Sequence, residues 1–157
     1  MNKLTDTQIK EALSKMGKQD KLNMALYRRV YSHFGLSSCE LWIFYYLQLS
    51  GQGITQKDMC QQMFFPKQTI NSAVSNLVKK GMVTLDESPD NRKNKIINLT
   101  EDGKKAAQET AQKLLQAEIK ATEKLGSEKT ALYNQMRAEY YDLLKSEFES
   151  DFLKDEE

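Results

Sequence analysis

The sequence has little of what catalytic and metal centres usually need. Its 157 residues include one histidine, His33, and two cysteines, Cys39 and Cys60, which lie 21 positions apart without a CxxC spacing. Zinc sites use three or four nitrogen or sulfur ligands, and histidine is the usual acid–base group near neutral pH. No GxGxxG or GK(S/T) motif suggests a nucleotide cofactor. We therefore expect reduced thiols, no metal, no cofactor and no enzymatic activity.

Long hydrophobic runs are also missing. No apolar segment approaches the ~20 residues that a membrane-spanning helix needs. The first residues, MNKLTDTQIKE, lack the apolar core of a signal peptide. We therefore expect a cytoplasmic protein without membrane contact, and the length suits one domain, or one domain with appended helices.

Charge of one sign is not in excess over the whole chain, but it is unevenly distributed. The net charge is +1, which does not by itself predict a nucleic-acid partner. Residues 66–105 carry eight basic and five acidic side chains, whereas residues 147–157 carry six acidic ones and a single lysine. An acidic tail therefore masks a basic middle of the chain, and we expect the tail to be dispensable for any binding of DNA.

Two helices are predicted before residue 52 from hydrophobic residues at helical spacing. The first covers residues 20–34 and ends at Gly35. Ser37 and Glu40, three residues apart, form a capping box in front of the apolar run LWIFYYLQL. This second helix is expected to end near Gly51.

The next two helices are shorter and lie close together in the sequence. Thr55 is a predicted N-cap, with Asp58 three residues later, for a helix over residues 55–63. Pro66 is then placed as the first residue of the helix PKQTINSAVSNLVKK, which Gly81 ends.

After this helix the period of the pattern changes from 3.6 to 2. The segments MVTLDE and NKIINLT predict two strands joined by a long basic loop. Thr100 caps a long helix to about Leu125, and Gly126–Ser127 is a stop followed by the N-cap of a last helix. The predicted fold is mostly α with a small β-hairpin, in which a winged helix-turn-helix is combined with long additional helices.

The helix after Pro66 has two contrasting faces. Ile70, Ala73, Val74 and Leu77 form the expected buried stripe. The other side carries amides and hydroxyls, and no acidic residue occurs between residues 66 and 84. Amides can pair with adenine edges, and hydroxyls with bases or phosphates. The predicted DNA contacts are Lys67, Gln68, Thr69, Asn71, Ser72, Ser75 and Asn76. The alternative is an ordinary solvated helix face.

The loop between the strands supplies a second set of candidates. Arg92, Lys93 and Lys95 can reach phosphates or enter a minor groove, and Asp90 can hold an arginine in place. The alternative is a charged loop that only keeps the hairpin soluble.

At this point the sequence resembles the MarR family, the multiple antibiotic resistance regulators. PKQTINSAVSNLVKKGMV resembles the family's recognition helix, and DNRKNKIINLTEDGK resembles its wing signature. If the sequence is aligned with the family's wing at Leu99, Lys93 occupies the position of the wing arginine. If it is aligned at Asp90, Arg92 occupies that position, but the loop then has one extra residue. Both basic residues therefore stay candidates.

The resemblance implies a homodimeric, DNA-binding transcriptional regulator, a repressor in most cases, that reads a pseudo-palindromic operator. The implied division of the chain is an N-terminal dimerisation helix (1–36), a winged DNA-binding domain (37–99), C-terminal dimerisation helices (100–148) and an acidic tail (149–157). Long helices with one apolar face at both ends of the chain agree with a dimer. A winged-helix module that binds proteins, without specific DNA binding, is the alternative.

The family also implies a small effector, often an aromatic acid. The residues that we predict to line its site are Tyr27, Tyr31, Trp42, Tyr45 and Tyr46, with Arg28 for a carboxylate. The alternative is that these rings belong to the core or the dimer interface. Cys39, in the first turn of a capped helix, is either a redox-sensing thiolate or a small hydrophobic residue.

Overall fold

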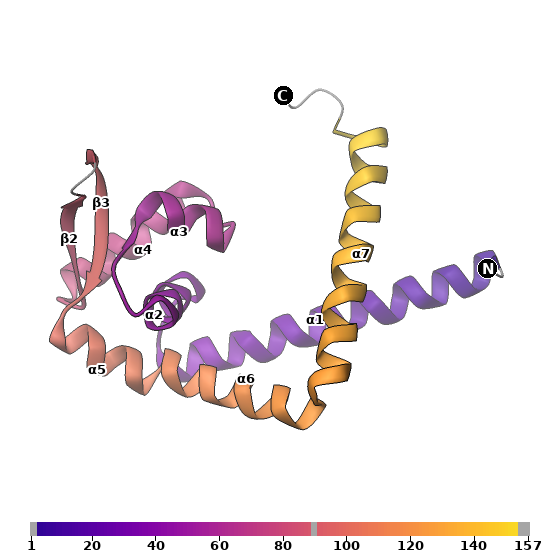
Figure 1. Ribbon diagram of the computed structural model, residues 1–157, viewed down its shortest axis with the longest axis horizontal. Helices are drawn as coiled ribbons and strands as arrows, with labels where there is room; N and C mark the ends of the chain where they lie inside the picture. Colours follow the sequence, from indigo (N-terminus) through magenta and orange to yellow (C-terminus); the bar gives the residue numbers. More distant parts are fainter. Residues whose placement is uncertain (1–2, 89–90, 154–157) are drawn as a thin grey trace. The chain divides into compact units, whose positions relative to one another are not determined.

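The computed structural model describes residues 3–88 and 91–153, with the side chains of 88 and 91–94 outside the description. Among the described residues the chain forms helices and one small sheet (Figure 1). It divides into two compact units, Met1–Leu114 and Leu115–Glu157. The predicted fold class, mostly α with a winged helix-turn-helix, is confirmed.

The first two helices begin with the same capping device. α1 (Asp6–Phe34) starts at a capping box between Thr5 and Gln8, so it is much longer than the predicted 20–34. α2 (Ser38–Ser50) starts at the predicted box. The main-chain N–H of Glu40 donates to Ser37 Oγ (3.2 Å), and that of Ser37 donates to Glu40 Oε2 (2.9 Å).

The helix-turn-helix follows as α3 (Gln56–Met63) and α4 (Lys67–Lys79). Thr55 caps α3 as predicted, since its hydroxyl accepts from the N–H of Asp58 at 3.1 Å. Pro66 is the N-cap of α4 and not its first helical residue. This is a shift of one position from the prediction, because Pro66 keeps an extended backbone with ψ 138°.

The wing consists of β2 (Val83–Ser88) and β3 (Asn91–Leu99), an antiparallel pair as predicted. A third strand, β1 (Ile54–Thr55), was not predicted and gives the order β1-β3-β2. Both Ile54 and Leu85 lie opposite Ile97. Gly53, just before β1, has no room for a side chain, because a Cβ would lie 2.0 Å from Asn98 Oδ1.

The predicted long helix from Thr100 to Leu125 is wrong in one respect. The structure divides it into α5 (Glu101–Glu109) and α6 (Ala111–Leu125), with Thr110 at φ −121° and ψ −84°. The Thr110 hydroxyl donates to the carbonyl of Ala106 at 2.7 Å. α7 (Ser127–Asp151) starts after Gly126, which is its N-cap in place of the predicted Ser127.

The hydrophobic core lies in the first unit, between α2, the helix-turn-helix, the sheet and α5. The predicted stripe of α4 is buried without exception. By contrast, no residue of α1 or α7, helices that the structure describes in full, is buried. No helix in the described part of the chain has the length and apolarity to cross a membrane.

Candidate nucleic-acid interface

The outer face of α4 is a continuous polar surface without an acidic side chain. All seven residues predicted to contact DNA from this helix are exposed: Lys67, Gln68, Thr69, Asn71, Ser72, Ser75 and Asn76. Ser72 Oγ donates to the carbonyl of Gln68 at 2.9 Å, so this hydroxyl offers only its lone pairs to a ligand. Other described residues make no hydrogen bond to the side-chain amides of Gln68, Asn71 and Asn76, which leaves both their donors and their acceptors available.

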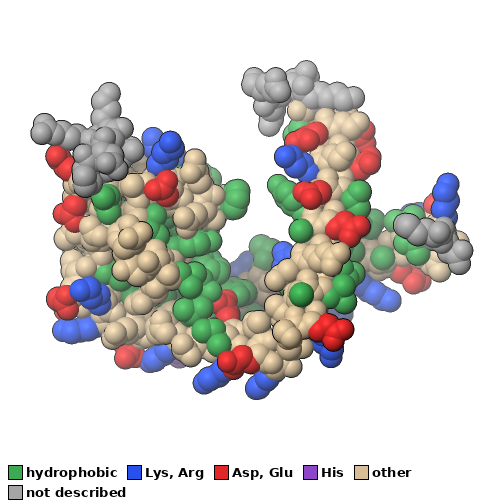
Figure 2. Space-filling model, viewed as in Figure 1, with side chains coloured by type: hydrophobic (Ala, Val, Ile, Leu, Met, Phe, Trp, Pro, Cys, Tyr) green, Lys and Arg blue, Asp and Glu red, His purple; other side chains and the backbone are tan. Residues whose placement is uncertain are grey.

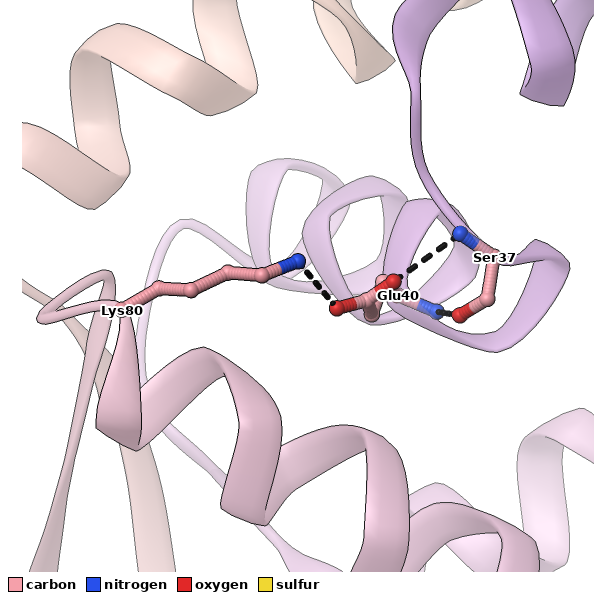
Figure 3. Close-up of polar contacts among 3 residues, drawn as sticks. All are labelled: Ser37, Glu40 and Lys80. Atoms are coloured by element: carbon pink, nitrogen blue, oxygen red, sulfur yellow. Dashed lines mark hydrogen bonds and ion pairs between the residues drawn. The ribbon is translucent and has the colours of Figure 1, made fainter.

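An ion pair fixes the far end of α4 to the beginning of α2 (Figure 3). Lys80 Nζ donates to Glu40 Oε1 at 2.8 Å, while the other oxygen of Glu40 accepts from Ser37. Burial of the Glu40 carboxyl opposes its ionisation, but the hydrogen bonds from Lys80 and Ser37 outweigh burial and lower the pKa of Glu40. Sequence reasoning found the Ser37–Glu40 box but missed Lys80, which lies 40 positions away.

The base of the wing is held by polar contacts across its strands. Asp86 accepts hydrogen bonds from Thr84 Oγ1 (3.1 Å) and from Asn98 Nδ2 on the opposite strand (2.7 Å). Lys95 is exposed and lies opposite Glu87 in the register.

The other wing candidates are only partly described. Arg92 and Lys93 lie in β3, but their side chains fall outside the description, as does all of Asp90. Both Arg92 and Lys93 therefore remain candidates for the groove-binding residue.

The end of the wing is joined to α4 and α5 at one corner. Thr100 Oγ1 donates to the carbonyl of Gly81 (2.6 Å) and accepts from the N–H of Gly103 (3.0 Å). A Cβ at Gly103 would lie 1.8 Å from the carbonyl oxygen of Met82, so only glycine fits. Thr100 and Gly103 of the segment that resembles the wing signature thus have a structural role, because their contacts fix the positions of the wing and of α5 relative to the end of α4.

The turn between α3 and α4 holds a residue that sequence reasoning did not select. Phe64 has φ 51°, a left-handed conformation that non-glycine residues rarely adopt, and its side chain is 91% exposed. The available signal was the Phe-Phe-Pro sequence at the expected turn, where glycine or asparagine is the usual helix-ending residue.

The predicted effector residues are largely brought together by α1 and α2. Trp42 is the centre of this aromatic cluster: its Nε1 donates to Tyr31 Oη at 3.1 Å, and its ring lies 5.9 Å from that of Tyr27 and 5.0 Å from that of Tyr45. Tyr46 also contacts Trp42, at 6.3 Å. All five aromatic residues are partly buried, whereas Arg28 is exposed.

Tyr46 additionally lines an open surface pocket of about 480 Å³ beside α3 and β1. Its hydroxyl donates to the carbonyl of Gln62, which also lines the pocket. The other predicted effector residues do not line this pocket.

Cys39 lies in the hydrophobic core. Its side chain is buried, and burial together with the neighbouring Glu40 carboxylate raises the pKa of the Cys39 thiol to about 11. Burial and the raised pKa therefore favour the second reading of Cys39, a small hydrophobic residue. Among the described residues, no cluster of three or more His, Cys, Asp or Glu side chains could hold a metal ion.

Comparisons with known proteins agree with this geometry. Residues 34–93 match the sequence profile of the MarR family. Similar solved structures include NMB1585, a MarR family regulator from Neisseria meningitidis, with 22% identity and a TM-score of 0.74 over 89% of this chain and 99% of that one. AbsC, a MarR family transcriptional regulator from Streptomyces coelicolor, has 16% identity and a TM-score of 0.73 over 93% and 99% of the two chains.

A third similar structure contains nucleic acid. It is a mutant of MepR from S. aureus bound to an oligodeoxyribonucleotide, with 20% identity and a TM-score of 0.50 over 92% of this chain and 99% of that one. A search of curated protein sequences gives no significant match.

Proposed function

We propose that the chain, whose residues 34–93 match the MarR family profile, is a cytoplasmic transcriptional regulator of that family that binds a pseudo-palindromic DNA operator as a homodimer and represses transcription. The observation that carries this proposal is the exposed, acid-free face of α4. A helix face that only needs to be solvated is usually rich in glutamate and lysine, which are strong helix formers. Amides and hydroxyls in their place can read base edges without repelling phosphate.

The wing would supply contacts to the DNA backbone beside that helix. Lys95 is exposed, and Arg92 and Lys93 lie further towards the tip in the same strand. Basic side chains on such a loop can neutralise phosphates, and arginine is favoured in a narrow minor groove. Asp90, which comes directly before β3 in the sequence, would orient an arginine by a charge-assisted hydrogen bond.

The two longest helices support the homodimer. α1 has Ile9, Leu13 and Met16 along one face, each at least 41% exposed in the single chain. α7 carries Leu132 and Met136 one turn apart, and Figure 2 shows hydrophobic side chains along this helix. Exposed apolar faces of this length are typical of protein interfaces. We therefore assign residues 1–36 and 100–148 to dimerisation and residues 37–99 to DNA binding.

A two-fold dimer makes a prediction about the DNA. Its two α4 helices would enter successive major grooves, so the half-sites should lie about 10 base pairs apart as an inverted repeat. MepR, one of the similar structures, has been solved with an oligodeoxyribonucleotide bound, which agrees with this use of the fold.

We also place an effector site at the aromatic cluster of α1 and α2. Partly buried rings offer stacking surface, and the exposed Arg28 would pair with the carboxylate of a small aromatic acid. Trp42 is the single tryptophan of the chain. Its fluorescence should therefore change in a saturable way on titration with aromatic acids, and Arg28→Ala should weaken the response to acids but not to uncharged analogues. Equal weakening for both classes would contradict the role of Arg28.

The deciding experiment is selection from a random duplex pool, followed by affinity measurements at several salt concentrations. We expect an inverted repeat for the wild type, and an affinity loss of about tenfold or more for the Arg92→Ala/Lys93→Ala variant. The slope of log affinity against log salt should become shallower by about 2, since each phosphate contact contributes close to one unit.

A matched control removes two exposed basic residues elsewhere. Lys120→Ala/Lys124→Ala, on α6, changes the net charge equally and should leave affinity and slope nearly unchanged. If the pool yields no enriched sequence at low salt, the chain is better explained as a winged-helix module that binds proteins.

A further inference from the structure

The turn between α3 and α4 contains two neighbouring phenylalanines with opposite environments. Phe65 is half-buried and packs on the hydrophobic core. Phe64 is 91% exposed, the highest value among the described large hydrophobic residues, and ends α3 by donating its N–H to the carbonyl of Cys60 at 3.2 Å. The fold therefore uses only one of the two rings for packing.

Phe64 is unfavourable for folding in two independent ways. Its backbone lies at φ 51° and ψ 24°, and among the described residues every other positive φ belongs to a glycine. Glycine or asparagine ends a helix in this conformation at lower cost, because the Cβ of other residues meets the backbone. An aromatic ring in water brings no compensating burial. Backbone outliers of this kind point to a functional role when the fold does not explain them.

The position of Phe64 indicates which chemical group its ring can contact. It precedes Lys67, the first residue of α4, by three positions, so it lies at the end of the helix whose residues normally approach the bases. A phenyl ring has no hydrogen-bonding group, and the apolar feature of the major groove is the 5-methyl group of thymine. Resting on the proposed DNA binding, we propose that Phe64 contacts a thymine methyl in each half-site and contributes to operator specificity.

The experiment removes the Phe64 ring and the thymine methyl group, separately and together, and measures the affinity for the operator each time. Phe64→Asn removes the ring but suits the left-handed backbone, so its melting temperature should equal or exceed that of the wild type. Replacing single thymines of the selected operator by deoxyuridine removes only the methyl group. For the wild type we expect affinity to fall about fourfold at one symmetry-related thymine position, the value of one buried methyl group.

The variant should bind the unmodified operator more weakly and show no further loss at that deoxyuridine position. Leu49→Asn removes another exposed apolar side chain, near the end of α2, and should keep the wild-type response to deoxyuridine. Equal deoxyuridine losses in the wild type and in Phe64→Asn would overturn the contact. So would an operator whose affinity is insensitive to every methyl group.

The two proposals fail differently. If an operator is recovered but Phe64→Asn binds it like the wild type, only the inference on Phe64 is overturned. If neither protein binds any duplex, the proposed DNA binding is overturned and this inference with it.

Discussion

α2 and α7 are both helices with several aromatic and aliphatic residues, yet their environments are opposite. α2 has 13 residues, of which six are buried, and its rings pack within the first unit. α7 has 25 residues, none of them buried. Apolar content alone therefore does not decide burial in this chain. The winged domain completes its own core, whereas neither α7 nor α1 has a buried residue in the single chain.

Removing a core ring should have the largest effect. Phe44, on α2, is 1% exposed, so Phe44→Ala should lower the free energy of unfolding by about 3–5 kcal/mol, since it leaves a cavity. Phe152, just after α7, is 76% exposed, and Phe152→Ala should change the free energy of unfolding by less than about 0.5 kcal/mol. Urea denaturation of both variants measures the contrast, and similar losses would mean that α7 is packed as tightly as α2.

Charges on the apolar face of α7 should weaken the proposed dimer. Leu132→Asp/Met136→Asp should raise the dimer dissociation constant about 100-fold or more, because two side chains lose their apolar burial. Light scattering over a dilution series measures the mass. Asn134→Asp/Ser146→Asp adds the same charge at exposed polar positions of α7 and should stay dimeric. A wild type that is monomeric at all concentrations would contradict the dimer itself.

The ion pair between α2 and α4 should contribute less. Lys80→Met leaves the Glu40 carboxylate buried without its cation, but Lys80 is itself half exposed, so we expect a loss of roughly 1 kcal/mol at neutral pH. Urea denaturation at pH 7 measures it. Lys79→Met removes the neighbouring exposed lysine and serves as the control.

The same carboxyl predicts a pH dependence with a definite sign. The folded pKa of Glu40 lies below its ordinary value of 4.5, so the stability that Glu40 contributes is complete above that value and is lost as the pH falls below it through the folded pKa. Glu40→Gln should therefore flatten the fall in unfolding free energy below about pH 5. Parallel curves for wild type and variant would contradict a lowered pKa.

The smallest effect concerns the cysteines. With a pKa of about 11, the Cys39 thiol is almost fully protonated at pH 7.5 and is also buried, so alkylation should be slow in the folded protein. Cys60 is only partly buried and should react first. Mass spectrometry of Cys39→Ser and Cys60→Ser after timed iodoacetamide treatment distinguishes the two sites. Faster labelling of Cys39 would restore a redox role.

Local signals were enough to predict most of the elements. The Ser37–Glu40 box, the Thr55 and Thr100 caps and the apolar stripe of α4 each depend on residues within one or two helical turns. β1 was missed because two residues carry no readable period, and the strand exists only through its pairing with β3. The break at Thr110 lies in the backbone angles of that single residue, which hydrophobic spacing does not report.

The candidate site also contains some features that local sequence patterns predict and others that they do not. The polar face of α4 could be read from one helix, and the structure places all of it at the surface. The contact of Lys80 with Glu40 joins residues far apart in the sequence, so no local pattern indicates it. Phe64 escaped selection because its exposure and its backbone conformation become visible only when the turn is built.

The corner at Thr100 and Gly103 has a mechanical consequence. Thr100 is bonded to Gly81 at the end of α4, its N–H donates to the carbonyl of Met82 at the start of the wing, and Gly103 packs against that same carbonyl. Neither α4 nor the wing can tilt against α5 without breaking these contacts. A displacement of α5 would therefore move α4 and the wing together as one rigid unit, and in the proposed dimer it would change the spacing of the two α4 helices without changing the shape of either α4 face.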